Sequence, residues 1–243
     1  MKFITIDLEI EQPYTNIQSP DSRTDKQELI QIGIVVFEIV EFEPVILHSE
    51  TMNIFYGEPL SIFIKTLTSI SDENVNSSDN HAIDGVVRLR ELQQQFDTSR
   101  QIVEWGSGDI SFLLESAGIS QSLFNSKYGF ARSTINVKVL YQLYAMMNGK
   151  KVRGGLSTSM GKLGLQFKGT RYKGHNKGKH WAEADALNTA RIFNRLCNLI
   201  KRDVITLSEK DFDKIQSELD NPKPYNEKLQ EGMRKHREKY NKD

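Results

Sequence analysis

The chain has 243 residues, of which 38% are hydrophobic and 26% are charged, and this composition excludes collagen-like, coiled-coil and disordered proteins. A chain of this length can bury a full hydrophobic core as one domain with a short extension. Lysine plus arginine number 32, as do aspartate plus glutamate, so the formal net charge is zero, which argues against a protein that coats nucleic acid or an anionic membrane.

Three strands are predicted in the first quarter of the chain, at residues 2–9, 29–38 and 45–55. The first alternates in character and is rich in β-branched residues, and the second is apolar almost throughout, as is typical of a central strand. A polar stretch of roughly twenty residues separates these two strands, and a loop of that length in a compact domain is usually functional or mobile.

Helices predominate after the third strand. Residues 101–105 form a short predicted strand, and Asp109 begins a helix. The other predicted helices cover residues 59–67, 83–96, 136–147, 157–163 and 181–200. Strands followed by interleaved helices indicate an α/β layered domain, which we assign to residues 1–202. Residues 203–243 are charge-dense, and a capping pattern at Ser208 predicts a helical C-terminal extension in place of a second catalytic domain.

Cysteine content and hydropathy predict a cytoplasmic protein. Cys197 is the single cysteine, so no disulfide can form within the chain, which favours a reducing compartment. The apolar run at residues 3–6 is too short for a signal peptide, and no stretch approaches the roughly 20 apolar residues that span a bilayer. We therefore expect no membrane partner.

The neutral net charge conceals an uneven distribution. Residues 1–115 contain 20 acidic and 7 basic side chains, whereas residues 116–182 contain 12 basic side chains and no acid. An acid-free run of this length attracts an anionic partner, although shorter basic runs are usually only solvated. The charge pattern is therefore compatible with a nucleic-acid ligand.

Asp7 and Glu9 stand at the end of the first predicted strand. Because they alternate with Ile6 and Leu8, both carboxylates point to one side of the strand. Two neighbouring carboxylates repel each other unless a hard cation lies between them. This pair alone is weak evidence for a metal site, but an acidic end to an apolar strand strengthens it.

Two further acids and one histidine occupy the ends of later elements. Asp109 follows a glycine-containing turn at the start of a helix, where α/β proteins place ligands, although a simple N-cap role is the alternative. Asp185 falls in the first turn of the last long helix, where the helix dipole favours a carboxylate. His180 lies five residues upstream, and its ordinary pKa suits a general base.

These five residues, in this order, resemble the DEDDh family of 3′-to-5′ exonucleases. Asp7 and Glu9 match its first motif, Asp109 its second, and His180 with Asp185 its third. The resemblance covers residues 2–198, and secondary marks at residues 60–70, 163–169 and 185–191 are most similar to the Eri-type exoribonuclease branch. It implies a ribonuclease H-like fold, with a mixed sheet flanked by helices.

The resemblance also implies a reaction and its cofactors. Asp7, Glu9, Asp109 and Asp185 would hold two Mg²⁺ or Mn²⁺ ions, and His180 would accept a proton from the attacking water. The expected substrate is single-stranded nucleic acid, with RNA favoured and DNA open. The expected products are nucleoside 5′-monophosphates released from the 3′ end.

The segment before His180 is longer and more basic than the family pattern, and it supplies the candidate nucleic-acid contacts. These candidates are Lys168, Arg171, Lys173, Lys177 and Lys179. Tyr128, Phe130 and Tyr172 are candidates for base stacking, with a core role as the alternative. Other departures from the family are Ile10, where many members have Thr, and the long loop after the first strand.

Two other functions stay open. The chain could be a non-catalytic nucleic-acid-binding or regulatory module on an exonuclease fold, with residues 203–243 docking a protein partner. It could also be a proofreading exonuclease that acts with a polymerase. The sequence does not decide between RNA and DNA, because a few pocket contacts read the 2′-hydroxyl.

Overall fold

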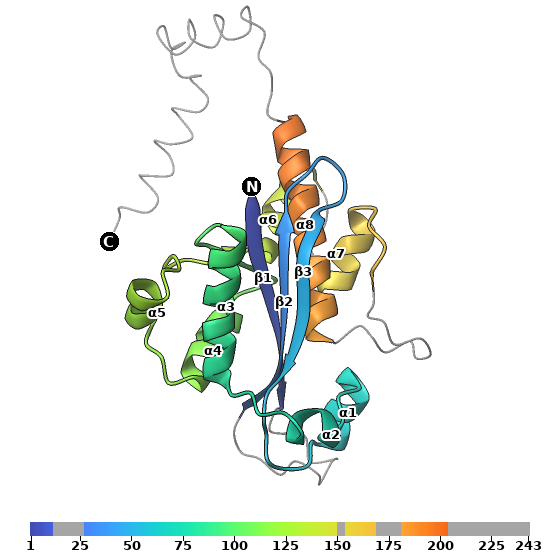
Figure 1. The fold of residues 1–243 in the computed structure, drawn as a ribbon. Helices are drawn as coiled ribbons and strands as arrows, with labels where there is room; N and C mark the ends of the chain where they lie inside the picture. The colour runs from blue at the N-terminus through green and yellow to red at the C-terminus, as the bar shows by residue number, and fades with distance from the viewer. Residues whose placement is uncertain (12–26, 150–153, 169–180, 204–243) are drawn as a thin grey trace, which may run out of the picture. The chain divides into compact units, whose positions relative to one another are not determined.

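A computed structural model describes residues 1–11, 27–149, 154–168 and 181–203 (Figure 1). The chain divides into two compact units, Met1–Lys201 and Arg202–Asp243, and nearly all of the second unit lies outside the described residues. The helical extension predicted at residues 203–243 is therefore not described beyond the end of the last helix.

The first unit is built on a five-stranded mixed sheet. Its strands are β1 (Lys2–Glu11), β2 (Glu28–Glu38), β3 (Val45–Asn53), β4 (Ile102–Glu104) and β5 (Ile135–Asn136), in the spatial order β3-β2-β1-β4-β5. β1 pairs antiparallel with β2 and parallel with β4. The mixed sheet that the family resemblance implies is confirmed, and β1 is its central strand.

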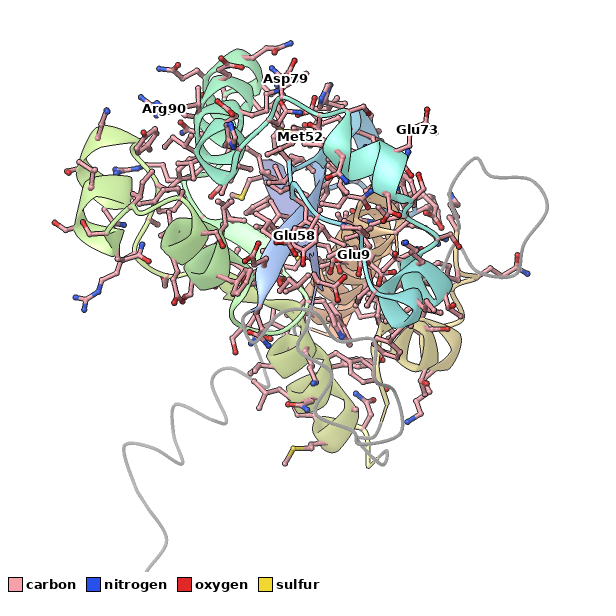
Figure 2. All side chains as sticks on the ribbon, turned by 90° about the horizontal axis from the view of Figure 1, so that it is seen from below. Glu9, Met52, Glu58, Glu73, Asp79 and Arg90 are labelled. Atoms are coloured by element: carbon pink, nitrogen blue, oxygen red, sulfur yellow. The ribbon has the colours of Figure 1, made fainter. Side chains whose placement is uncertain are left out.

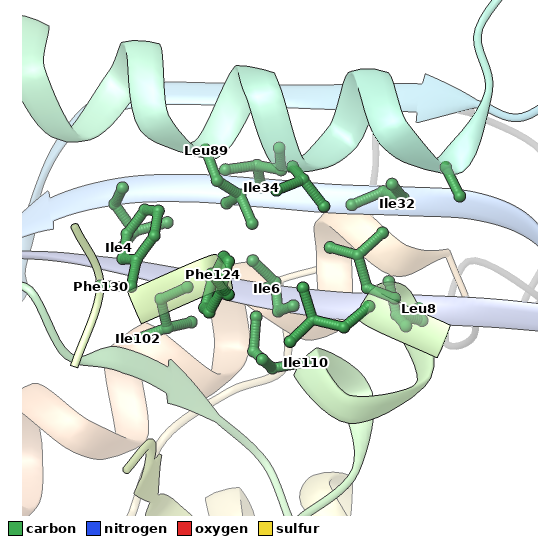
Figure 3. Close-up of a cluster of buried hydrophobic side chains, with 14 of the residues drawn as sticks. Ile4, Ile6, Leu8, Ile32, Ile34, Leu89, Ile102, Ile110, Phe124 and Phe130 are labelled. Atoms are coloured by element: carbon green, nitrogen blue, oxygen red, sulfur yellow. The ribbon is translucent and has the colours of Figure 1, made fainter. Parts of the chain in front are cut away.

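Helices cover both faces of this sheet (Figure 1). They are α1 (Ile62–Thr68), α2 (Asp72–Asn76), α3 (Ala82–Phe96), α4 (Asp109–Ser116), α5 (Gln121–Lys127), α6 (Val137–Met147), α7 (Leu156–Lys162) and α8 (Ala182–Asp203). On one face, α3, α4 and α5 enclose a core with alternate β1 residues, Ile4, Ile6 and Leu8 (Figure 3). On the other face, α6, α7 and α8 pack on a second core that begins at Phe3.

A third, smaller cluster lies under α1 and α2. It consists of Ile30, Leu60, Ile64, Ile70 and Val75, and the half-buried Trp181 packs against it. Because Trp181 immediately precedes α8, this cluster links the start of α8 to the segment after β3.

Most predicted elements are present, with shifted ends. The helix predicted at 59–67 begins at Ile62, because the Ser61 hydroxyl accepts a hydrogen bond from the backbone N–H of Ile64 and acts as the N-cap. The sequence pattern does not predict α2, α5 or β5, which have five, seven and two residues. Within the described residues, no helix has the length and apolar character needed to cross a bilayer.

Candidate active site

Asp7 and Glu9 lie on the face of β1 that α8 covers. Their neighbours Ile6 and Leu8 point into the opposite core, as the alternation predicts. Across the antiparallel pair, Asp7 faces Gly33 and Glu9 faces Gln31 of β2. When the molecule of Figure 1 is seen from below, Glu9 lies well inside its outline, whereas Glu73 and Asp79 lie at the rim (Figure 2).

The close approach of α8 to β2 brings Asp185 to the same place. Gly33 permits this approach, because a Cβ atom at that position would lie 2.1 Å from the backbone carbon of Ala182 and 2.1 Å from the backbone nitrogen of Glu183. Small buried side chains at Ala186 and Ala190 continue the contact along the helix. Asp185, in the first turn of α8, is thereby placed beside Asp7 and Glu9 of β1.

Three of the predicted acids form one cluster. Asp7, Glu9 and Asp185 each offer an oxygen, and these oxygens lie within 4.8 Å of one another. Oδ1 of Asp185 is buried and finds no hydrogen-bond partner among the described residues. A buried carboxylate oxygen without a donor, beside two other carboxylates, fits a hard divalent cation such as Mg²⁺ or Mn²⁺.

Asp109 lies close to this cluster but outside the group that shares the 4.8 Å limit. It is the first residue of α4, and the N-cap position belongs to Gly108, whose φ of 129° is one that favours glycine. The alternative interpretation of Asp109 as an N-cap is therefore wrong. Its charge acts on the cluster, since it contributes to the raised pKa of Asp7 and of Glu9.

Burial is the main cause of a raised pKa at all four acids. It raises the pKa of Asp7 well above its usual range, with additions from Asp109, Asp185 and Glu9. It raises the pKa of Glu9 to about 9, and Asp185 is the next cause. For Asp109 and Asp185 the pKa rises to about 7. Without a cation, the site therefore holds protons at neutral pH, and cation binding must displace them.

Sequence reasoning missed Glu104, at the end of β4. This side chain is buried, and its carboxylate accepts hydrogen bonds from the Thr134 hydroxyl at 2.6 Å and from the backbone N–H of Ile110 at 3.4 Å. Because Gly108 has no side chain to cap α4, Glu104 supplies that acceptor and fixes the helix that carries Asp109. An acid at the end of an apolar strand, here β4, is a sequence signal at this position, but the contact with Thr134 that defines its role has no such signal.

Several predicted contacts lie outside the described residues: His180, Arg171, Tyr172, Lys173, Lys177 and Lys179. Lys168 is described, and its Nζ lies 3.5 Å from a carboxylate oxygen of Glu43. Tyr128 and Phe130 are buried in the core beneath α3, α4 and α5, so their core interpretation is the one that the structure supports.

Comparisons with known proteins support the resemblance at the level of structure. No protein-family model and no curated protein matches the chain. Among solved structures, a 3′-exonuclease in 3′-end specific recognition of a histone mRNA stem-loop is 20% identical with a TM-score of 0.60, and the match covers 81% of this chain and 63% of that one. The chain thus spans less than two thirds of that protein's length.

Two further structures extend this comparison. The nuclease domain of 3′hExo, a DEDDh family member bound to rAMP, is 18% identical with a TM-score of 0.55, and the match covers 84% of this chain and 92% of that one. E. coli Exonuclease I in complex with a dT13 oligonucleotide is 12% identical with a TM-score of 0.53, over 88% and 45% of the two chains. At these identities the comparisons show the fold, which is the ribonuclease H-like fold of the DEDDh exonucleases.

Proposed function

We propose that this chain is a divalent-metal-dependent 3′-to-5′ exonuclease of the DEDDh family that hydrolyses single-stranded nucleic acid to nucleoside 5′-monophosphates. The observation that carries the proposal is the convergence of Asp7, Glu9 and Asp185, with an unpartnered buried oxygen on Asp185. The fold shared with solved 3′-exonucleases supports the same reaction class.

In the proposed mechanism, the four acidic side chains would bind the divalent cations. Asp7, on the central strand, would hold two divalent cations together with Glu9, Asp109 and Asp185. Cations held there would polarise the scissile phosphate and neutralise its developing charge. Glu9 is buried, and Asp7, Asp109 and Asp185 are half-buried. The local dielectric is therefore lower than in water, which strengthens the attraction of these carboxylates for a cation.

His180 is the proposed general base, which accepts the proton of the attacking water. The sequence supports this role, because His180 precedes Trp181, which lies at the start of α8, and stands five residues before Asp185. Imidazole groups titrate near neutral pH in water, which makes histidine a common general base in catalysis.

RNA is the favoured substrate because the secondary sequence marks resemble the Eri-type branch. Solved structures of similar fold include complexes of those proteins with a histone mRNA stem-loop, with rAMP and with a DNA oligonucleotide, so DNA is a second substrate class to test. Lys168 and the basic residues that follow it supply candidate phosphate contacts.

The test is digestion of 5′-labelled oligonucleotides by the full chain. Matched single-stranded and double-stranded RNA and DNA, each with a free or a blocked 3′ end, are incubated with Mg²⁺, with Mn²⁺ or with a chelator. We expect a ladder of products shortened from a free 3′ end of single strands, and none with the chelator. Oligonucleotide binding without any hydrolysis would overturn the proposal in favour of a binding module.

A further inference from the structure

Glu183 lies two residues before Asp185 in the first turn of α8, on the other side of the helix. At 3.6 residues per turn, two positions differ by about 200° around the helix axis. Asp185 therefore faces β1, whereas Glu183 faces β3. Both oxygens of Glu183 are occupied there: the Ser49 hydroxyl donates to Oε1 at 2.5 Å, and the Thr51 hydroxyl donates to Oε2 at 2.9 Å.

Two more hydrogen bonds fix the same turn of α8. The indole Nε1 of Trp181 donates to Oγ1 of Thr51 at 3.0 Å, and the backbone N–H of Ala182 donates to Oε1 of Gln31 at 3.2 Å. Gln31 is fully buried and is the cross-strand partner of Glu9. We refer to the contacts of Glu183, Ser49 and Thr51 as the α8 anchor.

An anchor at this point opposes the repulsion that arises when the acids are ionised. Asp185 faces two carboxylates within the 4.8 Å cluster, and ionised groups at that distance favour movement of the start of α8 away from β1. Gly33 removes the steric obstacle to a close approach, but it supplies no attraction. The hydroxyls of β3 supply that attraction from the side opposite the cluster.

We infer that Glu183 is a positioning residue, which holds Asp185 at the distance from Asp7 and Glu9 at which all three carboxylates bind one divalent cation. Glu183 is not itself a ligand, because both of its oxygens accept hydrogen bonds from β3. The consequence for hydrolysis rests on the proposed function, whereas the consequence for cation binding does not.

The test measures Mn²⁺ binding to the full chain, by electron paramagnetic resonance or calorimetry, without substrate. Glu183→Ala is expected to weaken Mn²⁺ affinity roughly 10- to 100-fold, the usual effect of removing a group that orients a ligand. Glu183→Gln retains one acceptor and can donate to a hydroxyl, so its loss should be smaller. Ser49→Ala, which removes one exposed hydroxyl, should weaken binding without loss of the fold.

A double variant of Glu183 and Ser49 distinguishes a positioning role of Glu183 from a general loss of structure. Because Glu183→Ala and Ser49→Ala remove the same hydrogen bond, their effects on Mn²⁺ affinity should not add in the double variant. Glu115→Ala is the matched control, since this exposed glutamate in α4 makes no side-chain hydrogen bond or ion pair with the described residues. The control should bind Mn²⁺ like the unmodified chain.

Hydrolysis gives the second readout. With Glu183→Ala, the Mn²⁺ concentration for half-maximal activity should rise, while kcat at saturating Mn²⁺ stays close to that of the unmodified chain. Unchanged Mn²⁺ affinity in Glu183→Ala overturns the inference, as does a loss of kcat that saturating Mn²⁺ does not restore. A chain that binds Mn²⁺ with this dependence on Glu183 but hydrolyses no oligonucleotide refutes the proposed function alone.

Discussion

Each acid of the candidate site is buried or half-buried beside other acids, and this couples proton binding to cation binding. The raised pKa of Asp7, Glu9, Asp109 and Asp185 is the consequence of collecting negative charge where water is scarce. Such an arrangement is typical of sites where a bound cation neutralises the negative charge. Individual substitutions therefore act on stability and on activity in opposite directions.

Asp7→Asn should abolish hydrolysis while stabilising the metal-free chain. Loss of a direct ligand is expected to reduce kcat/KM by more than the roughly 100-fold typical of a supporting residue. The neutral amide also removes a buried charge that its neighbours repel, so Tm in chelator at mildly alkaline pH should rise. Labelled-oligonucleotide digestion and thermal unfolding check the two effects.

Asp79→Asn is the control for this substitution, because Asp79 is exposed and lies away from Glu9 in Figure 2. It should change neither hydrolysis nor Tm. Full activity in Asp7→Asn would refute the assignment of the site.

The stability of the metal-free chain should fall as pH rises. The four acids have a higher pKa in the folded chain than in the unfolded chain, so the folded chain holds more protons between the ordinary aspartate value of 3.8 and about 9, the value for Glu9. Stability falls with pH wherever the folded state binds more protons. Thermal unfolding in chelator across this interval measures the decline.

Excess Mg²⁺ should reverse this trend, because it binds the ionised carboxylates. The gain in Tm from Mg²⁺ is expected to grow across the same interval. A gain that is independent of pH would contradict the proposed coupling.

At the residue scale, the sequence predicted the candidate ligands better than the residues that support them. Asp7, Glu9 and Asp185 were predictable because strand alternation and the helix start fix their directions. Glu104 and Glu183 were not, because their role depends on hydroxyls at Thr134, Ser49 and Thr51 that are distant in sequence. Such contacts have no local periodicity to reveal them.

At the element scale, the placement of α8 depends on the missing side chain of Gly33. A Cβ there would clash with backbone atoms of Ala182 and Glu183, which cannot move without shifting the helix. Gly33→Ala should therefore cost at least the roughly 1–3 kcal/mol of an overpacked core. It should also weaken Mn²⁺ binding, because Asp185 moves with α8. Chemical denaturation and Mn²⁺ titration measure the two losses.

Gly85→Ala is the matched control for this substitution. Its new Cβ would meet the terminal carbon of the Ile32 side chain, on the other face of the sheet, and that side chain can adjust. Some loss of stability with intact Mn²⁺ binding is expected. Equal loss of Mn²⁺ binding in both variants would show that Gly33 acts only through global stability.

The elements that the sequence did not predict are too short to show a periodic pattern of apolar residues. β5 has two residues and forms through its pairing with β4, and α2 has five residues and is held by a capping box between Ser71 and Asn74. Long elements such as β2 and α8 were predictable, because many residues repeat the same burial pattern. Short elements depend on partners that sequence periodicity does not register.

At the scale of the whole molecule, the acid-free run at residues 116–182 does not form a single described basic face. Lys127 lies on α5 and Lys138 on α6, and these helices pack on opposite sides of the sheet. The run is continuous in sequence, but the fold distributes it over both sides. Candidate strand contacts are therefore better sought near Lys168 than along the whole run.

Replacing Lys173, Lys177 and Lys179 together by Ala should raise KM for single-stranded RNA with little change in kcat. The slope of log affinity against log salt should also become shallower by about 0.7 for each phosphate that the variant no longer neutralises. Hydrolysis at several salt concentrations measures both effects. The double variant Lys127→Ala with Lys138→Ala, from the same acid-free run, is the control. An equal change in the two variants would mean that net charge, and not position, determines binding.

Trp181 is an intrinsic fluorescence probe of the start of α8. Its indole donates to Thr51, which also holds Glu183, and its ring packs against the cluster beneath α1 and α2. The chain has only two tryptophans, and the other is Trp105. Indole emission responds to polarity and hydrogen bonding. In a Trp105→Phe variant, the fluorescence of Trp181 would therefore report the position of the start of α8 relative to β3. The rate at which a cation or an oligonucleotide binds could then be measured without an attached label.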